Sequence, residues 1–587
     1  MNYKLNSPKD ESYEKEGIFS MLKKFSPLIR DEKLPIFVAV VAILMNSGLN
    51  LLAPVVIGHT IDTYIVAKDF GGILMNAVVL IALYLGALTA GYAQTRIMGG
   101  VGQRVLFKLR NSVFNKLQEL PVAFFNENKA GDLISRINND TDKLNQFFSQ
   151  ALMQFLGNAF MILGSGILVV VLQPALGAAA LIPAFVLLVL TRLLSPWIKR
   201  QNEHSLQTTG GLSANISESL ENFKVVVAFN RRDYFNKHLK ASNEENYKAS
   251  VRAGIANNTF TPFYGFASGA AQLIVIGFGT YLITGGNLTI GLLISYLSYV
   301  TRFYDPLRQM ASIWSSFQLA LAAWDRVSVI LSLSSTMKLV PSTEVKEGDA
   351  LLEFKNVRFA YPNGKEVLHG VNLRLEAGKT YALVGPTGGG KTTTASLMAR
   401  LYDPTEGTVF LHGRDLQSYE QAERTKRIGF ILQEPFLFTG TLRENILYGN
   451  EEMQSVTNEA LAKVLADSGL DALLSRFDQG LATPIAASGD ATSLGQRQLI
   501  AFVRAALRKP DLLILDEATA NVDTVTEQLL QGILDRLPKE TTRVVIAHRL
   551  NTIANADDIF FVNSGEVKEA GSLEHAVSML MNNKRDS

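Results

Sequence analysis

Apolar residues are spread unevenly along the 587-residue chain. Before about residue 320 there are long windows without a charged side chain, whereas the pattern after about residue 350 is that of an ordinary water-exposed α/β domain. The charge-free windows are 34–61, 70–95, 144–191 and 253–301. A membrane-spanning helix needs about 20 apolar residues. The pattern therefore predicts an N-terminal membrane region followed by a separate C-terminal domain.

The lengths of the four windows predict six spanning helices. The first two windows hold one helix each, and the last two are long enough for two helices each. Turn residues interrupt both long windows, Gln173-Pro174 in one and Thr284-Gly-Gly-Asn287 in the other. Helical periodicity in the loops at 96–143 and 192–252 predicts helices that extend beyond the bilayer. The expected spans are about 34–61, 70–95, 147–172, 175–193, 262–283 and 288–308.

The loop charges predict the orientation in the membrane. Seven Lys and Arg residues precede the first span, eight lie in 96–143 and ten in 192–252, whereas the three alternate loops carry one, none and none. The positive-inside rule therefore places the N-terminus and both long loops in the cytoplasm. The C-terminal domain follows on the same side. We expect a multi-pass protein of the cytoplasmic membrane.

Composition narrows the possible partners. Hydrophobic residues make up 47% of the chain and charged residues 19%, with a mean hydropathy of +0.14, as expected for a protein in contact with a lipid bilayer. The net charge of +2 and the lack of a basic block argue against a nucleic-acid partner. The chain has no cysteine, which excludes disulfides, thiolate catalysis and cysteine metal sites.

Two motifs in the C-terminal domain indicate ATP hydrolysis. The run from Gly385 to Thr392 matches G-x-x-x-x-G-K-[ST], a loop whose backbone N–H groups wrap nucleotide phosphates, and the apolar segment 381–384 precedes it. Further along, the apolar run 512–515 ends in Asp516 and Glu517. That pair suits a Mg²⁺ ligand followed by a base that activates water. Each motif alone is weak, but their order and their flanking strands predict an ATPase.

The spans, the long helical extensions and the C-terminal ATPase together resemble one half of an ABC exporter of the multidrug and lipid-flippase type. The resemblance covers nearly the whole chain. It implies an all-α six-helix transmembrane domain with cytoplasmic extensions, followed by an α/β P-loop ATPase domain with a helical subdomain. The expected parts are an N-terminal segment 1–33 with an amphipathic helix on the membrane surface (or a solvated tail), a transmembrane domain 34–331, a linker 332–349 and a nucleotide-binding domain 350–587.

The resemblance assigns roles to residues of the ATPase domain. Glu517 would polarise the hydrolytic water, His548 would contact the γ-phosphate and Gln433 would sense Mg²⁺ and the attacking water. Thr392, Gln433 and Asp516 would hold Mg²⁺, in part through water. Tyr361 would stack on adenine, although a strand tyrosine can also be plain core. The expected ATP contacts are Tyr361, Gly385, Pro386, Thr387, Gly388, Gly389, Gly390, Lys391, Thr392, Thr393, Gln433, Asp516 and His548.

The segment that would cover the ATP of a partner domain departs from the family pattern. The family has Leu-Ser-Gly-Gly-Gln there, and this chain has Thr492, Ser493, Leu494, Gly495 and Gln496. Glycine at the third position lets the backbone and the helix N-terminus approach the γ-phosphate, and a leucine should hinder that approach. Upstream, residues 486–487 are both alanine where the family usually has Gly-Glu. Both departures fall on one surface.

Two cytoplasmic segments resemble the coupling segments of the family. Phe124 and Phe125 in the first, and Val226 in the second, would supply their apolar contacts. The sixth predicted span carries Arg302, Asp305 and Arg308 near the inner leaflet. Charges at that depth face protein or a water-filled cavity. They either contact substrate or pair with one another along the helix, and the second interpretation is favoured.

Three functional hypotheses follow. The leading one is a heterodimeric exporter in which this chain is the half with a complete hydrolytic face, paired with a second half-transporter that lacks a proper glutamate. The alternatives are a homodimeric exporter that tolerates its variant signature and an ATP-gated channel or regulator on the same scaffold. Glu517 and His548 argue against the last. ATP and Mg²⁺ are the expected cofactors, and the substrate is expected to be hydrophobic or amphipathic: a drug, a lipid or a peptide.

Overall fold

The computed structural model describes most of the chain. The described residues are 3–5, 27, 30–335, 337, 339–341, 350–362, 364–486, 492–516, 524–546, 553, 555–572, 574–575 and 578–579. The predicted amphipathic helix near the N-terminus lies largely outside them, as does most of the predicted linker. The chain forms two compact units. The first contains Met1–Lys9, Glu119–Ala130 and Leu333–Ser587, and the second contains Asp10–Gln118 and Gly131–Ser332.

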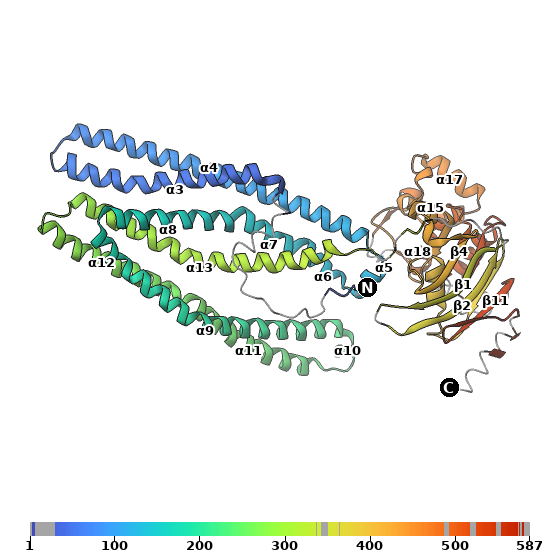
Figure 1. The fold of residues 1–587 in the computed structure, drawn as a ribbon. Coiled ribbons are helices and arrows are strands. Elements are labelled where there is room, and N and C mark those ends of the chain that lie inside the picture. The colour runs from blue at the N-terminus through green and yellow to red at the C-terminus, as the bar shows by residue number, and fades with distance from the viewer. Residues whose placement is uncertain are drawn as a thin grey trace. The chain divides into compact units, whose positions relative to one another are not determined.

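Long helices form the second unit (Figure 1). The helix α4 has 49 residues, which at about 1.5 Å per residue is more than twice the thickness of a bilayer core. The sequence prediction that helices extend beyond the membrane therefore agrees with its length. The helices are α3 (Lys33–His59), α4 (Phe70–Gln118), α6 (Ala130–Ser135), α7 (Thr141–Gln146), α8 (Leu152–Leu172), α9 (Pro174–Glu221), α10 (Phe223–Ala228), α11 (Arg232–Asn258), α12 (Phe260–Thr284) and α13 (Ile290–Ser332), with short π-helical turns after α3, α6 and α7.

Within the described part of the chain, five helical stretches are long and apolar enough to cross a membrane. They are Arg30–Ile65, Phe70–Gln118, Ala130–Leu172, Pro174–Glu221 and Arg232–Thr284. The sixth predicted span lies in α13, which is not among them. Three charged residues between positions 302 and 308 lower the hydropathy of that helix. Its passage through the membrane stays a prediction.

The helix breaks coincide with the turn residues in the long apolar windows. The helix α8 ends at Leu172, Gln173 is extended and Pro174 starts α9, where its fixed φ and missing N–H suit a first helical position. The helix α12 ends at Thr284, and Gly286 has a φ of +78° before α13 begins. A left-handed φ of this kind favours glycine.

Buried tyrosines of α13 form hydrogen bonds to other helices of the second unit. Tyr296, Tyr299 and Tyr304 are at most 2% exposed. The hydroxyl of Tyr299 donates to the Leu51 carbonyl (2.6 Å) and that of Tyr304 to the Ala180 carbonyl (2.9 Å). Because buried hydroxyls need partners, these bonds fix α13 against α3 and α9.

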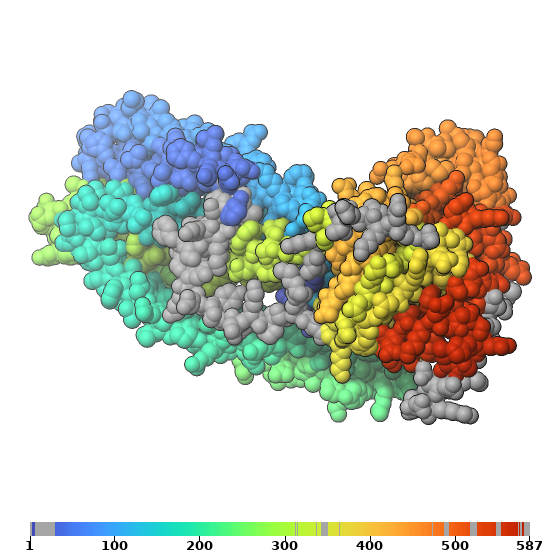
Figure 2. All heavy atoms as spheres, turned by 45° about the vertical axis from the view of Figure 1, so that its right-hand side comes forward, coloured from blue at the N-terminus to red at the C-terminus, as the bar shows by residue number. Residues whose placement is uncertain are grey.

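The first unit combines two main sheets. Four antiparallel strands are ordered β2-β1-β4-β5, and six strands, parallel apart from β12, are ordered β12-β11-β3-β10-β9-β6. In Figure 2 the yellow surface of β1 and β2 adjoins the red C-terminal surface, and β2 packs against β12. The strands are β1 (Ala350–Ala360), β2 (Glu366–Glu376), β3 (Thr380–Val384), β4 (Glu406–Leu411), β5 (Arg414–Asp415), β6 (Ile428–Ile431), β7 (Gly440–Thr441), β8 (Pro484–Ile485), β9 (Leu512–Asp516), β10 (Thr542–Ile546), β11 (Asp558–Asn563) and β12 (Glu566–Glu569).

Helices complete the first unit. They are α5 (Val122–Glu127), α14 (Lys391–Met398), α15 (Gln421–Arg427), α16 (Leu442–Ile446), α17 (Asn458–Asp467), α18 (Leu494–Ala506) and α19 (Thr524–Asp535). Buried aliphatic side chains of α16, α17 and α18 share one apolar cluster with β9 and α19. This cluster corresponds to the predicted helical subdomain. The predicted order, a region of long helices followed by an α/β domain, is thus confirmed.

Candidate nucleotide site

The phosphate loop has the backbone geometry that its motif predicts. It leaves β3 at Val384 and enters α14 at Lys391. Gly385 has a φ of +149°, and a Cβ built there would lie 1.9 Å from the Val562 carbonyl oxygen of β11. Gly390 has a φ of +114° and directly precedes α14. A side chain at either position would therefore distort the loop.

The sheet order brings the two ATPase motifs to one edge. The strands β3 and β9 both pair in parallel with β10, so their carboxyl ends lie on the same side of the sheet. The Thr392 hydroxyl, one residue into α14, lies 3.4 Å from the Asp516 carboxylate at the end of β9. Asp516 is 6% exposed. The hydroxyl and the carboxylate form a compact pair of hard oxygen donors.

The Lys391 side chain places a positive charge on the phosphate loop. Its ammonium group donates to the carbonyl of Gly385 at 2.8 Å and to that of Pro386 at 3.0 Å. The residue is only 6% exposed. Backbone amides, a helix N-terminus and a lysine ammonium together give a site suited to an anionic phosphate chain.

Tyr361 belongs to a group of three aromatic rings. Its ring meets Phe359 edge-on at 4.9 Å and Tyr402 at 5.3 Å, and its hydroxyl lies 3.0 Å from the Thr393 hydroxyl. Phe359 and Tyr402 are buried, whereas Tyr361 is half-buried. The ring of Tyr361 is therefore held in place beside α14 and keeps an accessible part, as a stacking residue requires.

The first of the two predicted coupling segments, which contains α5, lies in the same unit as these residues. The amide of Asn126 in α5 donates to the Tyr402 hydroxyl at 2.6 Å. Phe124 is fully buried, but Phe125 is 45% exposed. Burial raises the pKa of the Tyr402 hydroxyl above its ordinary value. The sequence did not single out Asn126 or Tyr402, since neither belongs to the motifs above and their partnership requires the fold.

The variant signature starts α18. Ser493 is its N-cap, and Ser493 and Gln496 form a reciprocal capping box: the Ser493 hydroxyl accepts from the Gln496 backbone amide at 3.2 Å and the Gln496 side chain accepts from the Ser493 amide at 2.9 Å. Leu494 is the first helical residue and is half-buried, as is Gly495. The helix start is therefore well formed, and the leucine side chain lies at its N-terminal turn.

The remaining predicted site residues are either outside the described residues or differ in their exposure. Glu517, His548 and Ala487 lie outside the described residues, whereas Gln433 is exposed after β6. Among the other positions of the phosphate loop, Thr387 and Gly388 are exposed and Gly389 is buried. Val226, in α10 of the second unit, is 6% exposed.

The three charged residues between positions 302 and 308 form no ion pair with one another in the described structure. Arg302 is half-buried, and Asp305 and Arg308 are exposed. The ion pairs within the described ranges include none between these three residues. The favoured interpretation, a cluster that neutralises itself along the helix, is therefore not the arrangement in this structure.

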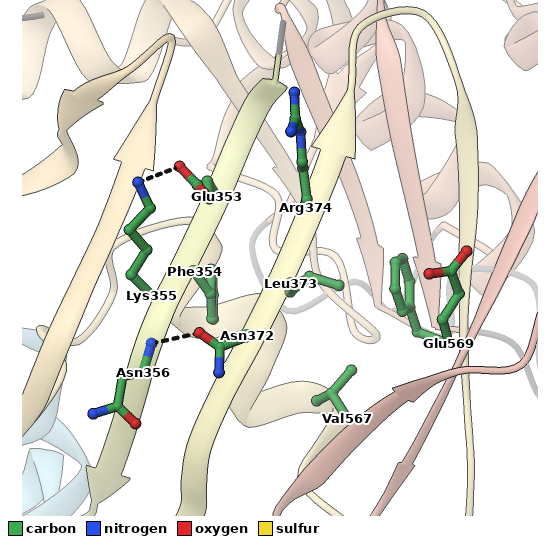
Figure 3. Close-up of a pocket in the computed structure, with 10 residues that line it drawn as sticks. Glu353, Phe354, Lys355, Asn356, Asn372, Leu373, Arg374, Val567 and Glu569 are labelled. Carbon is green, nitrogen blue, oxygen red and sulfur yellow. Dashed lines mark hydrogen bonds and ion pairs between the residues drawn. The ribbon is translucent and has the colours of Figure 1, made fainter. Parts of the chain in front are cut away.

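A separate pocket of about 620 Å³ lies where β1 and β2 meet β11 and β12 (Figure 3). Its lining includes the Glu353–Lys355 ion pair (2.9 Å) and Asn372, whose side-chain oxygen accepts a hydrogen bond from the Asn356 backbone N–H. These described residues include none of the predicted nucleotide contacts. The pocket is therefore distinct from the phosphate loop.

Comparison with known proteins identifies the family. The model of the ABC transporter transmembrane region matches residues 36–307, and the ABC transporter model matches residues 368–520. YfiC of Bacillus subtilis, an uncharacterised ABC transporter ATP-binding protein, is 31% identical over 567 residues, which are 95% of this chain and 92% of YfiC. The chain belongs to the ABC transporter family. It is an ABC exporter with fused transmembrane and ATPase domains.

Two further relatives are similar along most of their length. The fatty acid ABC transporter ATP-binding/permease protein of Mycobacterium tuberculosis is 31% identical over 504 residues, covering 86% of this ABC transporter and 79% of the relative. The ATP-dependent lipid A-core flippase of Syntrophus aciditrophicus is 28% identical over 567 residues, covering 96% and 94%. This ABC transporter is a multi-pass membrane protein that couples ATP hydrolysis to transport. As a half-transporter it needs a dimer partner.

Proposed function

We propose that this ABC transporter is the hydrolysis-competent half of a heterodimeric exporter. It moves a hydrophobic or amphipathic substrate across the cytoplasmic membrane by alternating access, with its N-terminus and ATPase domain in the cytoplasm. The observation that carries the proposal is the contrast between an intact phosphate-loop face and a signature altered at Leu494.

The phosphate-loop face supports binding and hydrolysis of ATP. The loop amides and Lys391 hold the phosphates, Tyr361 stacks on adenine, and Thr393 positions the tyrosine ring through the hydroxyl contact at 3.0 Å. Glu517 orients the hydrolytic water, and His548 and Gln433 contact the γ-phosphate side of the site. Phosphoryl transfer depends mainly on positioning and charge neutralisation, so this set suffices for one face.

Mg²⁺ fits the donor set on this face. The Thr392 hydroxyl and the Asp516 carboxylate are close together, and Mg²⁺ prefers oxygen ligands while keeping several waters. These two residues, with Gln433, would hold the ion, which neutralises phosphate charge when bound. The start of α14 holds the Thr392 hydroxyl in place, and the end of β9 holds the Asp516 carboxylate.

The signature face supports the asymmetry. An ABC site closes when the N-terminus of the signature helix approaches the γ-phosphate held by the other subunit. Leu494 puts a branched four-carbon side chain on the first turn of that helix. Ser493 and Gln496 keep the helix start capped, so the face can still close over a nucleotide that is held rather than hydrolysed. The proposed partner carries the non-hydrolytic site and a regular signature.

The contact between α5 and the ATPase domain supports a role for α5 in coupling ATP hydrolysis to transport. Phe124 is enclosed in the unit that contains the phosphate loop, and Asn126 bonds the aromatic group next to Tyr361. Movement at the nucleotide can therefore reach α5, which continues into the helical unit at both ends. We propose that α5 and the Val226 segment transmit closure of the ATPase domains to the membrane helices.

The relatives suggest the class of substrate. Their names include a fatty acid transporter, a lipid A-core flippase and multidrug resistance proteins. Lipids, acyl chains and hydrophobic drugs share an apolar body, which suits entry from the bilayer. Arg302, Asp305 and Arg308, with no ion pair between them in the described chain, would then be available to a polar head group.

Affinity purification of the tagged chain from its native membrane tests the proposal. The expected result is an equimolar second half-transporter whose residue equivalent to Glu517 is not glutamate and whose signature keeps its glycine. Recovery of this chain alone as a stable dimer would contradict the heterodimer.

A further inference from the structure

The chain's first residues are fixed to the segment that we assign to coupling. Residues 3–5 and α5 both belong to the first compact unit. Tyr3 is 2% exposed, one of the largest buried side chains of the described molecule. Its ring meets the fully buried Phe124 edge-on, with ring centroids 6.1 Å apart and the planes at 87°.

One side chain makes two hydrogen bonds to the backbone of this short segment. The Asn128 amide nitrogen donates to the Tyr3 carbonyl at 2.9 Å, and the Asn128 amide oxygen accepts from the Leu5 backbone N–H at 3.0 Å. The same nitrogen donates to the Phe124 carbonyl at 2.8 Å. Asn128 is 9% exposed, so water competes poorly for these bonds. Asparagine, with a donor and an acceptor on one amide, suits this pairing.

The far end of Tyr3 reaches a third part of the chain. Its hydroxyl donates to the Ser334 carbonyl at 3.3 Å, directly after α13 ends at Ser332. Residues 3–5 therefore join α5 to the start of the linker that leads to the ATPase domain. We call residues 3–5 the N-terminal strap.

We propose that the N-terminal strap locks α5 in its docked position, and that Tyr3 and Asn128 are positioning residues for coupling. The proposal rests on the coupling role given to α5 above. Without the strap, the bond from Asn126 to Tyr402 still holds α5. ATP would still bind and be hydrolysed, but α5 would undock more often. More ATP would then be used per substrate moved.

Hydrogen exchange tests the docked position without any substrate. In the assembled transporter we expect the backbone amides of 122–128 to exchange at least about fivefold faster in Tyr3→Ala and Asn128→Asp than in the parent. Asn128→Asp keeps the acceptor for Leu5 but loses the donor to both Tyr3 and Phe124, so Tyr3→Ala is the variant that isolates the strap. Leu5→Ala is the matched control, since its backbone N–H remains, and Tyr3→Phe keeps the ring. Both should exchange like the parent. Equal exchange in parent and Tyr3→Ala overturns the proposal.

Coupling is then measured in proteoliposomes. The probes are Hoechst 33342 extrusion and flipping of NBD-labelled phosphatidylethanolamine. For a probe that the parent moves with ATP, Tyr3→Ala should lower the transport rate per ATP hydrolysed at least about threefold, with the affinity for ATP unchanged and with recovery in Tyr3→Phe. An unchanged ratio overturns the coupling role of the strap. If the parent moves neither probe with ATP, the result contradicts the proposed substrate class. The exchange experiment then still decides whether the strap locks α5.

Discussion

The bond between Asn126 and Tyr402 should contribute measurably to the docking of α5. Asn126 is exposed apart from this contact, whereas Tyr402 is 9% exposed. Asn126→Ala takes the amide donor from a buried hydroxyl, which costs about 1–3 kcal/mol. Tyr402→Phe leaves the amide on a surface where water can replace its partner, so its cost should be nearer about 0.5–1 kcal/mol. We therefore expect Asn126→Ala to weaken docking more than Tyr402→Phe.

A double-mutant cycle isolates the bond. The two substitutions should be non-additive, with a coupling energy of about 1 kcal/mol, because the double variant lacks both partners of one hydrogen bond. This energy corresponds to a factor of about five in the opening equilibrium of α5. Hydrogen exchange of peptides that cover 122–128 in the full-length protein measures that equilibrium. Lys129 is exposed and lies next to α5, so Lys129→Ala is the matched control and should leave the exchange rate unaltered.

The proposed coupling role of α5 also predicts an effect on ATPase activity. Asn126→Ala should reduce the stimulation of ATPase by transported substrate while the dissociation constant for ATP stays within about twofold of the parent value, because Tyr361 keeps its contact with Thr393. Additive exchange effects, or unchanged substrate stimulation in Asn126→Ala, would refute the reasoning that the contact links α5 to the nucleotide.

Three further predictions concern the site and its coupling. Gly385→Ala should abolish ATP binding measured by calorimetry, because the added Cβ would lie 1.9 Å from the Val562 carbonyl, and retained binding would show that the loop can move aside. Glu517→Gln should lower steady-state ATPase of the assembled transporter below about a tenth of the parent rate with nucleotide binding retained; a higher rate would mean that another group is the main base. Phe124→Ala removes a fully enclosed ring at a cost of about 3–5 kcal/mol and should separate ATPase from transport, whereas Phe125→Ser, at a residue 45% exposed, should do so less; equal effects would contradict the enclosure.

The phosphate loop could be predicted because its chemistry is local. A run of glycines followed by lysine and threonine at the end of an apolar strand fixes both the backbone path and the groups that meet phosphate. The structure shows the required left-handed φ at Gly385 and Gly390. The same holds for the helix break at Pro174, where φ and the missing N–H act on one residue.

Charges in the last membrane helix illustrate a limit of sequence patterns. The spacing of Arg302, Asp305 and Arg308 favours pairing along one helix face. The structure holds no such pair among the residues it describes. Side-chain direction depends on neighbouring helices, and spacing alone does not specify it.

Contacts between distant segments could not be predicted from the sequence. Asn126 meets Tyr402 across 276 positions, and Tyr3 meets Ser334 across 331. Nothing in the local pattern of either pair indicates a partner, since neither the asparagine nor the tyrosine belongs to a motif. Only the fold, which places 119–130 with the C-terminal domain, brings them together.

The ATPase rate of the purified chain, free of any other subunit, tests the central claim most directly. Each composite site would then combine the intact Glu517 face with the Leu494 signature. We predict slow turnover, well below the about 1–10³ s⁻¹ typical of enzymes, and a strong increase in Leu494→Gly, whose helix N-terminus can approach the γ-phosphate. In the assembled heterodimer the same substitution should raise activity only modestly, because that signature covers the non-hydrolytic site. A stable homodimer that turns over at typical enzyme rates without the substitution would contradict the asymmetric account.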